Sequence, residues 1–399
     1  MGPDPLYDQV HVLAFNRPQY AAAVLRALAS LLPTGAGSPA VHVWIDGFAG
    51  SRDERQGVPD RRETVAWLVR RYLPQARMHR LATNIGIARM FARAEQLSLR
   101  QSRTAYTLFF EDDYVPGPDY LRALELLMAW GLQQPEVAIV TAHGIVAEHT
   151  AVLLPDLEQE LPLRPLFAHS LWAFAIKRTH LQERAAVLQP YLATMRGVRY
   201  SQRDHSAILA LHAAQGLGFV LGSSQDYAKH VALLQLQRLA VTVPQRLGRY
   251  IGRIGEHSTE ASFERLAYAR TLEDRFNPET YGQALQAPLE AALLRWSRLL
   301  ELMVIGVLLQ GQERQAQLAA TESELEQLRA RLAALEQQQQ HPPVESGTAV
   351  AASGHGALSN PMAPVAGATS PEPILRRAIG AGRRLRARLR GRLRRHPPA

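Results

Sequence analysis

Short apolar runs alternate with stretches of helical periodicity through the first 150 residues, and this alternation restricts the fold more than any other feature. Five runs are predicted to be strands, at 10–15, 41–45, 78–81, 106–110 and 137–141. Apolar residues at helical spacing fill the intervals between them. Nearly continuous apolar strands that alternate with helices are typical of a mostly parallel sheet covered on both faces. The sequence therefore predicts an open α/β sheet in the N-terminal half.

The alternation becomes less regular from about residue 160 to 270. An aromatic run, LFAHSLWAFAI, is followed by a predicted helix that starts at Asp204 and ends near Gly216. The run GFVLG, at 218–222, is predicted to be a short strand. We expect this half to supply the second wall of a ligand site.

The C-terminal part is predicted to be helical and then irregular. Residues 271–310 form a helical segment, and 311–340 show leucines at heptad spacing over about three heptads. This pattern fits a short coiled coil that joins copies of the chain, and it equally fits a lone amphipathic helix docked on the core. Residues 341–373 are rich in Pro, Gly, Ala and Ser, as in a disordered linker.

An arginine-rich tail carries the net charge of +9. Residues 374–396 hold ten arginines and no acid, so the rest of the chain carries a net charge of −1. This distribution argues against a body that binds a specific nucleic acid. Apolar residues interleave with the arginines over 374–399, which fits a segment lying on an anionic membrane surface. The alternative is a solvated tail, or one that touches nucleic acid non-specifically.

Cysteine is absent, which excludes disulfides, thiolate nucleophiles and cysteine-based zinc sites. The sequence opens without a basic segment followed by a long apolar one, so no secretory signal is predicted. The most apolar late stretch, 293–310, contains Arg295, Arg298 and Glu301, and it falls short of the about 20 apolar residues that span a bilayer. We expect a cytoplasmic protein, peripheral at the inner face of the membrane if the tail binds lipid.

Three consecutive carboxylates, Glu111, Asp112 and Asp113, end the apolar run at 106–110. Ligands of open α/β sheets bind outside the carboxyl ends of the strands, and Arg17 and Asp46 also follow predicted strands. Adjacent like charges are costly unless a cation offsets them. Carboxylate oxygens suit Mg2+ or Mn2+. The sequence thus predicts a metal-binding crevice, and the alternative is an acidic loop that faces water.

The order of these motifs resembles the GT-A glycosyltransferases. It runs Asn-Arg-Pro, VWIDG, HRLATNIGIARMF and LFFEDDYVPGPDYL, and it is most similar to the inverting N-acetylglucosaminyltransferase I group. A later segment, GRIGEHSTEASFERL, is similar to a Gly- and His-containing motif of that group. The resemblance spans about residues 8–270. It implies a Rossmann-like GT-A catalytic domain over 1–270, before the C-terminal helical and coiled-coil extension.

The resemblance implies a metal-dependent, inverting transfer of a sugar from a UDP sugar, such as UDP-GlcNAc, to an acceptor hydroxyl in glycan synthesis. The acceptor class, whether glycan, lipid-linked or protein, stays open, because the membrane anchor and cysteines of the eukaryotic members are missing. Arg17 is then expected near the nucleotide, Asp46 at the uracil edge and Asp112 at the ribose. Asp113 is expected to bind Mn2+ or Mg2+ across the diphosphate. Glu111 points to the other face of the strand and becomes an orienting group.

Further contacts are expected from later segments. Asn84 opens a helix whose N-terminal amides can meet phosphate, or it only caps that helix. His257 and Ser258 are expected to touch the metal or the diphosphate as the site closes, unless Ser258 is itself a helix cap. The family places a catalytic Asp before a helix, and Asp204 fits that place, although Asp is also a preferred N-cap. Trp172 is either a platform for a sugar face or a core residue.

Three other functions remain open from the sequence. A nucleotidyltransferase uses a similar sheet, but it favours a Gly-rich, Lys-containing loop after the first strand, and AFNRPQYAAAV contains neither residue. A glycosidase with a carboxylate pair requires neither metal nor nucleotide. A catalytically inactive scaffold acts through its coiled coil and basic tail.

Overall fold

The computed structural model divides the chain into two units, Met1–Trp296 and Ser297–Ala399. The structure describes residues 5–144, 164–165, 171–218, 220, 222–243, 245–255, 260–265 and 275–286, together with 323, 326, 327 and 330. The predicted coiled coil, linker and tail therefore lie outside the described residues, apart from those last four positions. All elements named below belong to the first unit.

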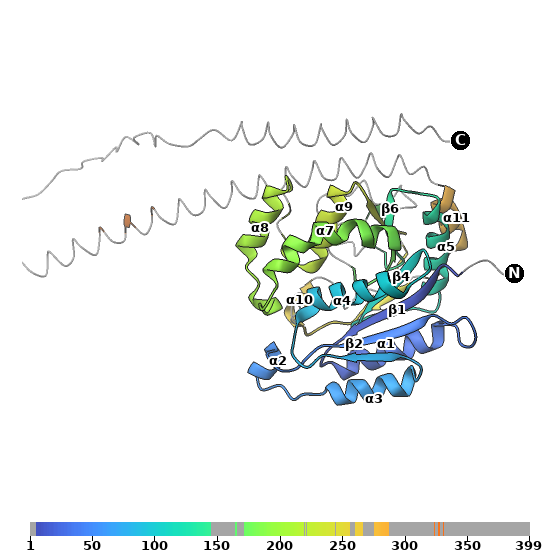
Figure 1. Ribbon diagram of the computed structural model, residues 1–399, viewed down its shortest axis with the longest axis horizontal. Helices are drawn as coiled ribbons and strands as arrows, with labels where there is room; N and C mark the ends of the chain where they lie inside the picture. Colours follow the sequence, from blue (N-terminus) through green and yellow to red (C-terminus); the bar gives the residue numbers. More distant parts are fainter. Residues whose placement is uncertain are drawn as a thin grey trace, which may run out of the picture. The chain divides into compact units, whose positions relative to one another are not determined.

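A mixed sheet of eight strands forms the centre of the first unit (Figure 1). The strands are β1 Tyr7–Ala14, β2 Ala40–Ile45, β3 Arg77–Arg80, β4 Tyr106–Glu111, β6 Val137–Thr141, β7 Arg164–Pro165, β8 Ala173–Lys177 and β9 Leu239–Thr242. Their order is β3-β2-β1-β4-β8-β6-β9-β7. The neighbours from β3 to β4 are all parallel, whereas β8 is antiparallel to both β4 and β6. A small antiparallel sheet pairs β5 Tyr114–Pro116 with β10 Gly248–Tyr250.

Helices cover both faces of the large sheet. They are α1 Pro18–Leu31, α2 Arg52–Arg55, α3 Arg62–Tyr72, α4 Gly86–Gln101, α5 Tyr120–Leu132, α7 Arg178–Thr194, α8 His205–Ala214, α9 Gln225–Gln235, α10 Glu260–Arg265 and α11 Pro278–Gln286. In Figure 1, α1 and α3 lie on one face and α4 and α7 on the other. The apolar part of β4 is buried throughout because both faces are covered.

The predicted architecture is confirmed. The five predicted strands correspond to β1, β2, β3, β4 and β6, and the helical patterns between them correspond to α1, α3, α4 and α5. The predicted helix after Asp204 is α8. The predicted strand at 218–222 is wrong, because its described residues lie outside any strand. Gly222 instead lies against the ring of Tyr227, where an added Cβ would be 2.1 Å from ring carbons.

A row of three histidines crosses neighbouring strands of the sheet. His11 on β1 stacks on His42 of β2 with ring centroids 4.9 Å apart, and His42 Nδ1 lies 2.9 Å from His79 Nε2. The Trp44 indole donates to His11 Nδ1 at 3.0 Å, and His11 Nε2 lies 2.8 Å from Ser98 Oγ. Burial lowers the pKa of all three histidines, that of His42 to about 4. This histidine row is therefore made of neutral rings at neutral pH.

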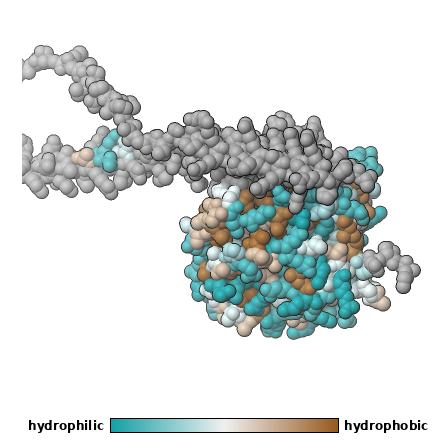
Figure 2. Space-filling view, turned by 45° about the horizontal axis from the view of Figure 1, so that its top comes forward, coloured by the Kyte–Doolittle hydropathy of each residue, from teal (hydrophilic) through white to brown (hydrophobic). Residues whose placement is uncertain are grey.

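Hydrophilic and hydrophobic residues interleave over the face of the first unit seen in Figure 2. The large apolar side chains exposed among the described residues are Val58, Trp67, Leu126, Leu132 and Ile254. Scattered apolar residues of this kind are ordinary on a protein surface. Within the described residues, every helix is too short or too polar to cross a bilayer.

Candidate active site

The acidic motif lies at the carboxyl end of the parallel strands. β4 ends at the half-buried Glu111, and Asp112 and Asp113 follow it with 2% and 4% of their surfaces exposed. Because β1 pairs with β4 and β2 pairs with β1, all in parallel, the residues after these strands reach the same edge of the sheet. Arg17 and Asp46 are those residues, as the sequence predicts.

Arg17 holds the two aspartates together. It immediately precedes α1, where Pro18 is well tolerated because the first helical N–H needs no partner. Its Nη1 donates to Asp113 Oδ2 at 2.9 Å, and its Nη2 donates to Asp112 Oδ1. Burial alone would lower the pKa of Arg17, but the two carboxylates outweigh it and raise that pKa. A permanently charged guanidinium thus offsets part of the negative charge.

One oxygen of this cluster has no partner. Asp112 Oδ2 accepts a hydrogen bond from the backbone N–H of Phe15 at 3.2 Å. Asp113 Oδ1 is buried, and within the described residues no donor reaches it. A buried carboxylate oxygen without a partner is costly, because it has lost its water and gained nothing in return. A cation or a hydrogen-bond donor at this atom would remove that cost.

The second sequence motif meets the first at this point. The backbone N–H of Ile251 donates to the carbonyl oxygen of Asp113 at 2.8 Å. A Cβ added at Gly252 would lie 2.7 Å from Asp113 Oδ2, and one at Gly255 would lie 3.0 Å from Arg17 Nη1. These two glycines are needed because the loop after β10 passes directly over the charged cluster. His257 and Ser258, from the same motif, lie outside the described residues.

Asp46, just after β2, caps α4. Its Oδ1 accepts from the backbone N–H groups of Gly47 at 2.8 Å and Ile85 at 2.9 Å, and its Oδ2 accepts from Gly86 at 2.9 Å. Burial raises the pKa of Asp46, and these amides oppose the rise. Asn84 ties the same turn together by donating to the carbonyl oxygen of Gly47 at 3.0 Å. Contacts of Asp46 and Asn84 with a nucleotide stay predictions.

A further acidic group, Asp226 on α9, interacts electrostatically with Asp113. Burial is the main cause that raises its pKa, to about 6, and the charge of Asp113 adds to the effect. Glu111 also has a pKa well above its usual range, because of burial and the charges of Asp113 and Asp226. Three carboxyl groups thus influence one another across the chain. Of these, Glu111 is the one predicted to orient the others, and that role stays a prediction.

Lys229 lies behind these carboxyl groups and is almost fully buried. Its Nζ stands 3.1 Å from the centroid of the Phe91 ring, and burial lowers its pKa to about 8. Its charge lowers the pKa of both Asp226 and Glu111, against the effect of burial. Lys229 is the cation of this part of the site, as Arg17 is of the other part.

Sequence reasoning missed Asp226. The residue lies half-buried in the first turn of α9, after the N-cap Ser224, whose hydroxyl accepts from the backbone N–H of Tyr227 at 3.4 Å. Gln225 donates its side-chain amide to Asp226 Oδ1. The signal in the sequence is a capping serine and an aspartate three residues before Lys229, which is one of the two lysines of the chain. Apolar periodicity does not reveal this helix, because several of its buried residues are polar.

Trp172 lies in a stack of aromatic rings beside the cluster. Its ring is 4.3 Å from that of Tyr250, with planes 18° apart, and 6.1 Å from that of Tyr114. Its carbonyl oxygen accepts from the backbone N–H of Glu111 at 2.7 Å. Only 9% of Trp172 is exposed, so in this structure the ring supports the wall of the site. A role as a sugar platform stays a prediction.

Asp204 is the exposed N-cap of α8. Its side chain accepts from the backbone N–H of Ala207 at 2.9 Å, which is the ordinary duty of a helix cap. Within the described residues, this is the one hydrogen bond of the Asp204 side chain, and no hydrogen bond or ion pair connects Asp204 to the acidic motif. Its role as a base stays a prediction.

The residues present fit a divalent cation with few protein ligands. Among the described residues, no group of three or more His, Cys, Asp or Glu side chains is arranged to hold a metal ion. Mg2+ commonly binds through one or two carboxylates and takes its other ligands from water and substrate phosphates, and Mn2+ accepts the same oxygen ligands. Asp113 Oδ1 offers the buried, negatively charged oxygen that such a site needs.

No protein-family model matches the chain, and no curated protein matches it in sequence. Solved structures with a similar arrangement include mannosyltransferase PcManGT from Pyrobaculum calidifontis in complex with GDP-Man and Mn2+, at 16% identity over 82% of each chain and a TM-score of 0.37. Residues 1–349 of S. aureus TarS match at 13% identity over 74% of this chain and 79% of that chain, with a TM-score of 0.35. Likeness at these identities concerns the arrangement of the chain alone.

Proposed function

We propose that the first unit is a metal-dependent, inverting glycosyltransferase that moves a sugar from a nucleoside-diphosphate sugar to an acceptor hydroxyl. The observation that carries this proposal is the buried, unpartnered Oδ1 of Asp113 at the carboxyl end of a parallel sheet, next to a guanidinium. Such an edge is where α/β proteins bind nucleotides. A UDP sugar is the first candidate donor, because the motifs resemble those of UDP-dependent enzymes.

The charged cluster suits the leaving diphosphate. Asp113 would hold Mn2+ or Mg2+, and the bound ion would supply Lewis-acid stabilisation of the negative charge that grows on the diphosphate. Arg17 keeps the Asp113 carboxylate oriented through its Nη1, so that Oδ1 stays turned away from the guanidinium. Asp112 is fixed from two sides, by Arg17 and by the Phe15 amide, and is proposed to meet the ribose.

We propose Asp226, in place of Asp204, as the base. In an inverting transfer the acceptor O–H proton passes to a carboxylate, the acceptor oxygen bonds to the anomeric carbon, and the bond from that carbon to the diphosphate oxygen breaks. Asp226 is half-buried, and burial, with a smaller contribution from the charge of Asp113, raises its pKa to about 6. A carboxylate of this basicity can accept a proton near neutral pH. Asp204 is exposed and committed to a helix cap.

A thermal-shift screen of the full chain tests the proposal. UDP, GDP and their sugars are added with and without Mn2+, and at least one nucleotide is expected to raise the melting temperature only when the metal is present. Asp113→Asn should remove the metal-dependent part of the shift, while Asp60→Asn, at an exposed ion pair with Arg62, should keep it. If no nucleotide stabilises the chain in a metal-dependent way, the transferase proposal fails.

The inactive-scaffold alternative is tested with the same variant. If Asp113→Asn leaves the biological activity of the chain intact, a catalytic role for the first unit is excluded. A nucleotidyltransferase would instead release pyrophosphate from a nucleoside triphosphate, which a pyrophosphate assay detects.

Membrane binding through the tail is a separate proposal, and removal of 374–399 should lower binding to anionic liposomes without changing transfer in solution.

A further inference from the structure

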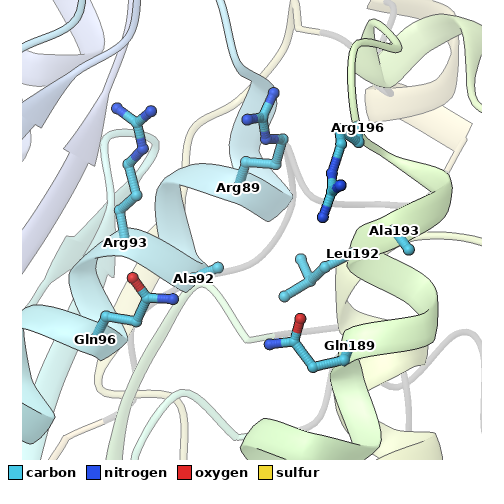
Figure 3. A pocket seen from close by; sticks show the side chains of 8 residues that line it. All are labelled: Arg89, Ala92, Arg93, Gln96, Gln189, Leu192, Ala193 and Arg196. Atoms are coloured by element: carbon cyan, nitrogen blue, oxygen red, sulfur yellow. The ribbon is translucent and has the colours of Figure 1, made fainter.

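A groove between α4 and α7 forms a second candidate site. It encloses about 220 Å³, and none of its lining residues belongs to the cluster around Asp113. Its polar lining consists of three arginines and two glutamines, and it contains no acidic residue. These side chains are Arg89, Arg93 and Gln96 from α4, Gln189 from α7, and Arg196 just after the end of α7 (Figure 3).

The charge of the groove is unbalanced, although the same helices balance charge elsewhere. Deeper between them, Arg184 of α7 donates to Glu95 of α4 at 2.7 Å, and this buried pair is neutral as a whole. In the groove, the side chains of Arg89, Arg93 and Arg196 form no ion pair or hydrogen bond with another described residue. At longer range, the charge of Arg93 lowers the pKa of Asp46. Arg89 and Arg93 are four residues apart on one helix, where like charges repel. An anion in the groove would relieve this repulsion.

The side chains of the groove are chemically matched to a phosphate and to hydroxyls. Guanidinium groups present paired N–H donors whose spacing fits phosphate oxygens. In Figure 3, Gln96 and Gln189 reach from opposite helices toward the space between them. A glutamine amide both donates and accepts hydrogen bonds, as recognition of a hydroxyl requires. Leu192 adds an apolar surface for carbon atoms.

The size of the groove limits the ligand. Sites for drug-sized molecules enclose about 300–1,000 Å³. At about 220 Å³, this groove is smaller than that range, and a phosphate with a single sugar ring is a ligand of suitable size. A long polyanion such as a nucleic acid would have to lie outside it.

We propose that the groove between α4 and α7 binds a soluble phosphorylated sugar, with its phosphate between Arg89 and Arg196 and its hydroxyls on Gln96 and Gln189. This site is separate from the proposed nucleotide-sugar site and does not depend on glycosyl transfer. The arginines contribute charge, and the glutamines distinguish a sugar phosphate from inorganic phosphate.

Isothermal titration of the full chain tests the site, with glucose 6-phosphate, glucose 1-phosphate, glucose and inorganic phosphate as the probes. At least one sugar phosphate is expected to bind at least 10-fold more tightly than glucose or phosphate. The double variant Arg89→Gln with Arg196→Gln should weaken that binding by 10-fold or more. Arg100→Gln, an exposed position on the same helix outside the groove, is the matched control and should bind as the parent chain does.

Several results would overturn the site. They are equal binding by the double variant, absence of binding by both sugar phosphates, and displacement of the sugar phosphate by UDP, which would place it in the nucleotide site. The groove would instead be a membrane contact if the parent chain binds phosphatidylglycerol vesicles but no sugar phosphate, and the double variant does not bind the vesicles. Arg196→Gln alone repeats the test if the double variant unfolds. The metal-dependent nucleotide shift should persist in both variants, which separates this proposal from the function proposed above.

Discussion

The histidine row and the acidic cluster bury ionisable groups on the same sheet, but they treat charge in opposite ways. In the row, His11, His42 and His79 stack and lose their charge. In the cluster, Asp112 and Asp113 keep a cation beside them. The buried polar atoms without a hydrogen-bond partner among the described residues include His42 Nε2 in the row and Asp113 Oδ1 in the cluster.

If the function proposed above is correct, the difference separates a stabilising group of residues from one that binds ligand. An unpartnered nitrogen on a neutral imidazole costs little more than a missing hydrogen bond, whereas an unpartnered oxygen on a buried carboxylate carries charge. Proteins retain such a costly atom where a ligand will meet it. We therefore expect substitutions in the cluster to change activity, and substitutions in the row to change stability and its pH dependence.

Asp113→Asn should produce the largest effect and breaks the comparison most directly. Removing the charge at the proposed metal ligand should lower transfer by about 10²–10³-fold or more, as loss of a key electrostatic group does. Stability should change by no more than about 1 kcal/mol, because the amide oxygen can still accept from Arg17. Initial rates and urea melts measure the two quantities. A variant that is less stable in urea but retains its specific activity while folded would place Asp113 with the stabilising groups.

Asp226→Asn should lower the turnover rate by about 10²–10⁴-fold while donor binding stays unchanged, because only proton acceptance is lost. Asp204→Asn is the matched control and should keep its rate. In the parent chain, the base must be ionised, so kcat should fall as pH drops below the pKa of about 6 and level off above it. A pH–rate profile checks this. If Asp204→Asn loses transfer and Asp226→Asn keeps it, the sequence prediction was the better one.

Acid should destabilise the chain through the histidine row. The folded pKa of His42 is lowered to about 4, so below the ordinary value of 6.5 the unfolded chain binds more protons than the folded one. Stability from this group is fully present above about pH 6.5 and is lost as pH falls toward 4. His42→Phe keeps the aromatic stack and removes the titrating group. Between pH 7 and pH 4, the variant should lose on the order of 1–2 kcal/mol less of its free energy of unfolding than the parent chain does. This figure is smaller than the full pKa shift implies, because the neighbouring His79 is only half-buried and water screens the charge. Urea melts at the two pH values measure the difference.

Two glycine substitutions give the smallest effects. Gly252→Ala places a methyl group 2.4 Å from the Tyr250 hydroxyl and 2.7 Å from Asp113 Oδ2, so it should weaken nucleotide binding by about 10-fold or more, equal to about 1.4 kcal/mol. Gly282→Ala, in the helix α11 with open space around it, should raise stability by about 0.5–1 kcal/mol and leave binding unchanged. Equal nucleotide binding by both variants would show that the loop is not packed on the cluster when ligand is bound.

The sequence predicts the fold well because its N-terminal half is locally consistent. Buried parallel strands must be apolar along their whole length, and helices must show period 3.6, so β4 and α1 are both visible without tertiary information. The acidic motif and Arg17 were also predictable, because strands that share an edge bring their following residues together.

What the sequence could not give depends on contacts between distant segments. In the sequence, an aspartate that contacts the uracil of a nucleotide cannot be distinguished from one that caps a helix. Only the hydrogen bonds from the backbone N–H groups of Ile85 and Gly86 show that Asp46 caps α4. Asp226 was hidden because its helix buries Lys229 and His230, which interrupt the apolar period. Asp204 was favoured for a different reason, because the family that the motifs resemble places its catalytic Asp before a helix and Asp204 fits that place.

The burial of both lysines has a practical consequence for chemical labelling. The chain has two lysines, Lys177 and Lys229, with 9% and 3% of their surfaces exposed, and Lys177 donates to the carbonyl oxygen of Gln134 at 2.7 Å. Burial lowers the pKa of each to about 8, so about a tenth of each side chain is the nucleophilic neutral amine at pH 7. Because both amines are buried, an acylating reagent should react slowly with them in the folded chain. The rate of acylation at Lys229 should therefore report how often the part of α9 that contains Asp226 and Lys229 becomes accessible to solvent.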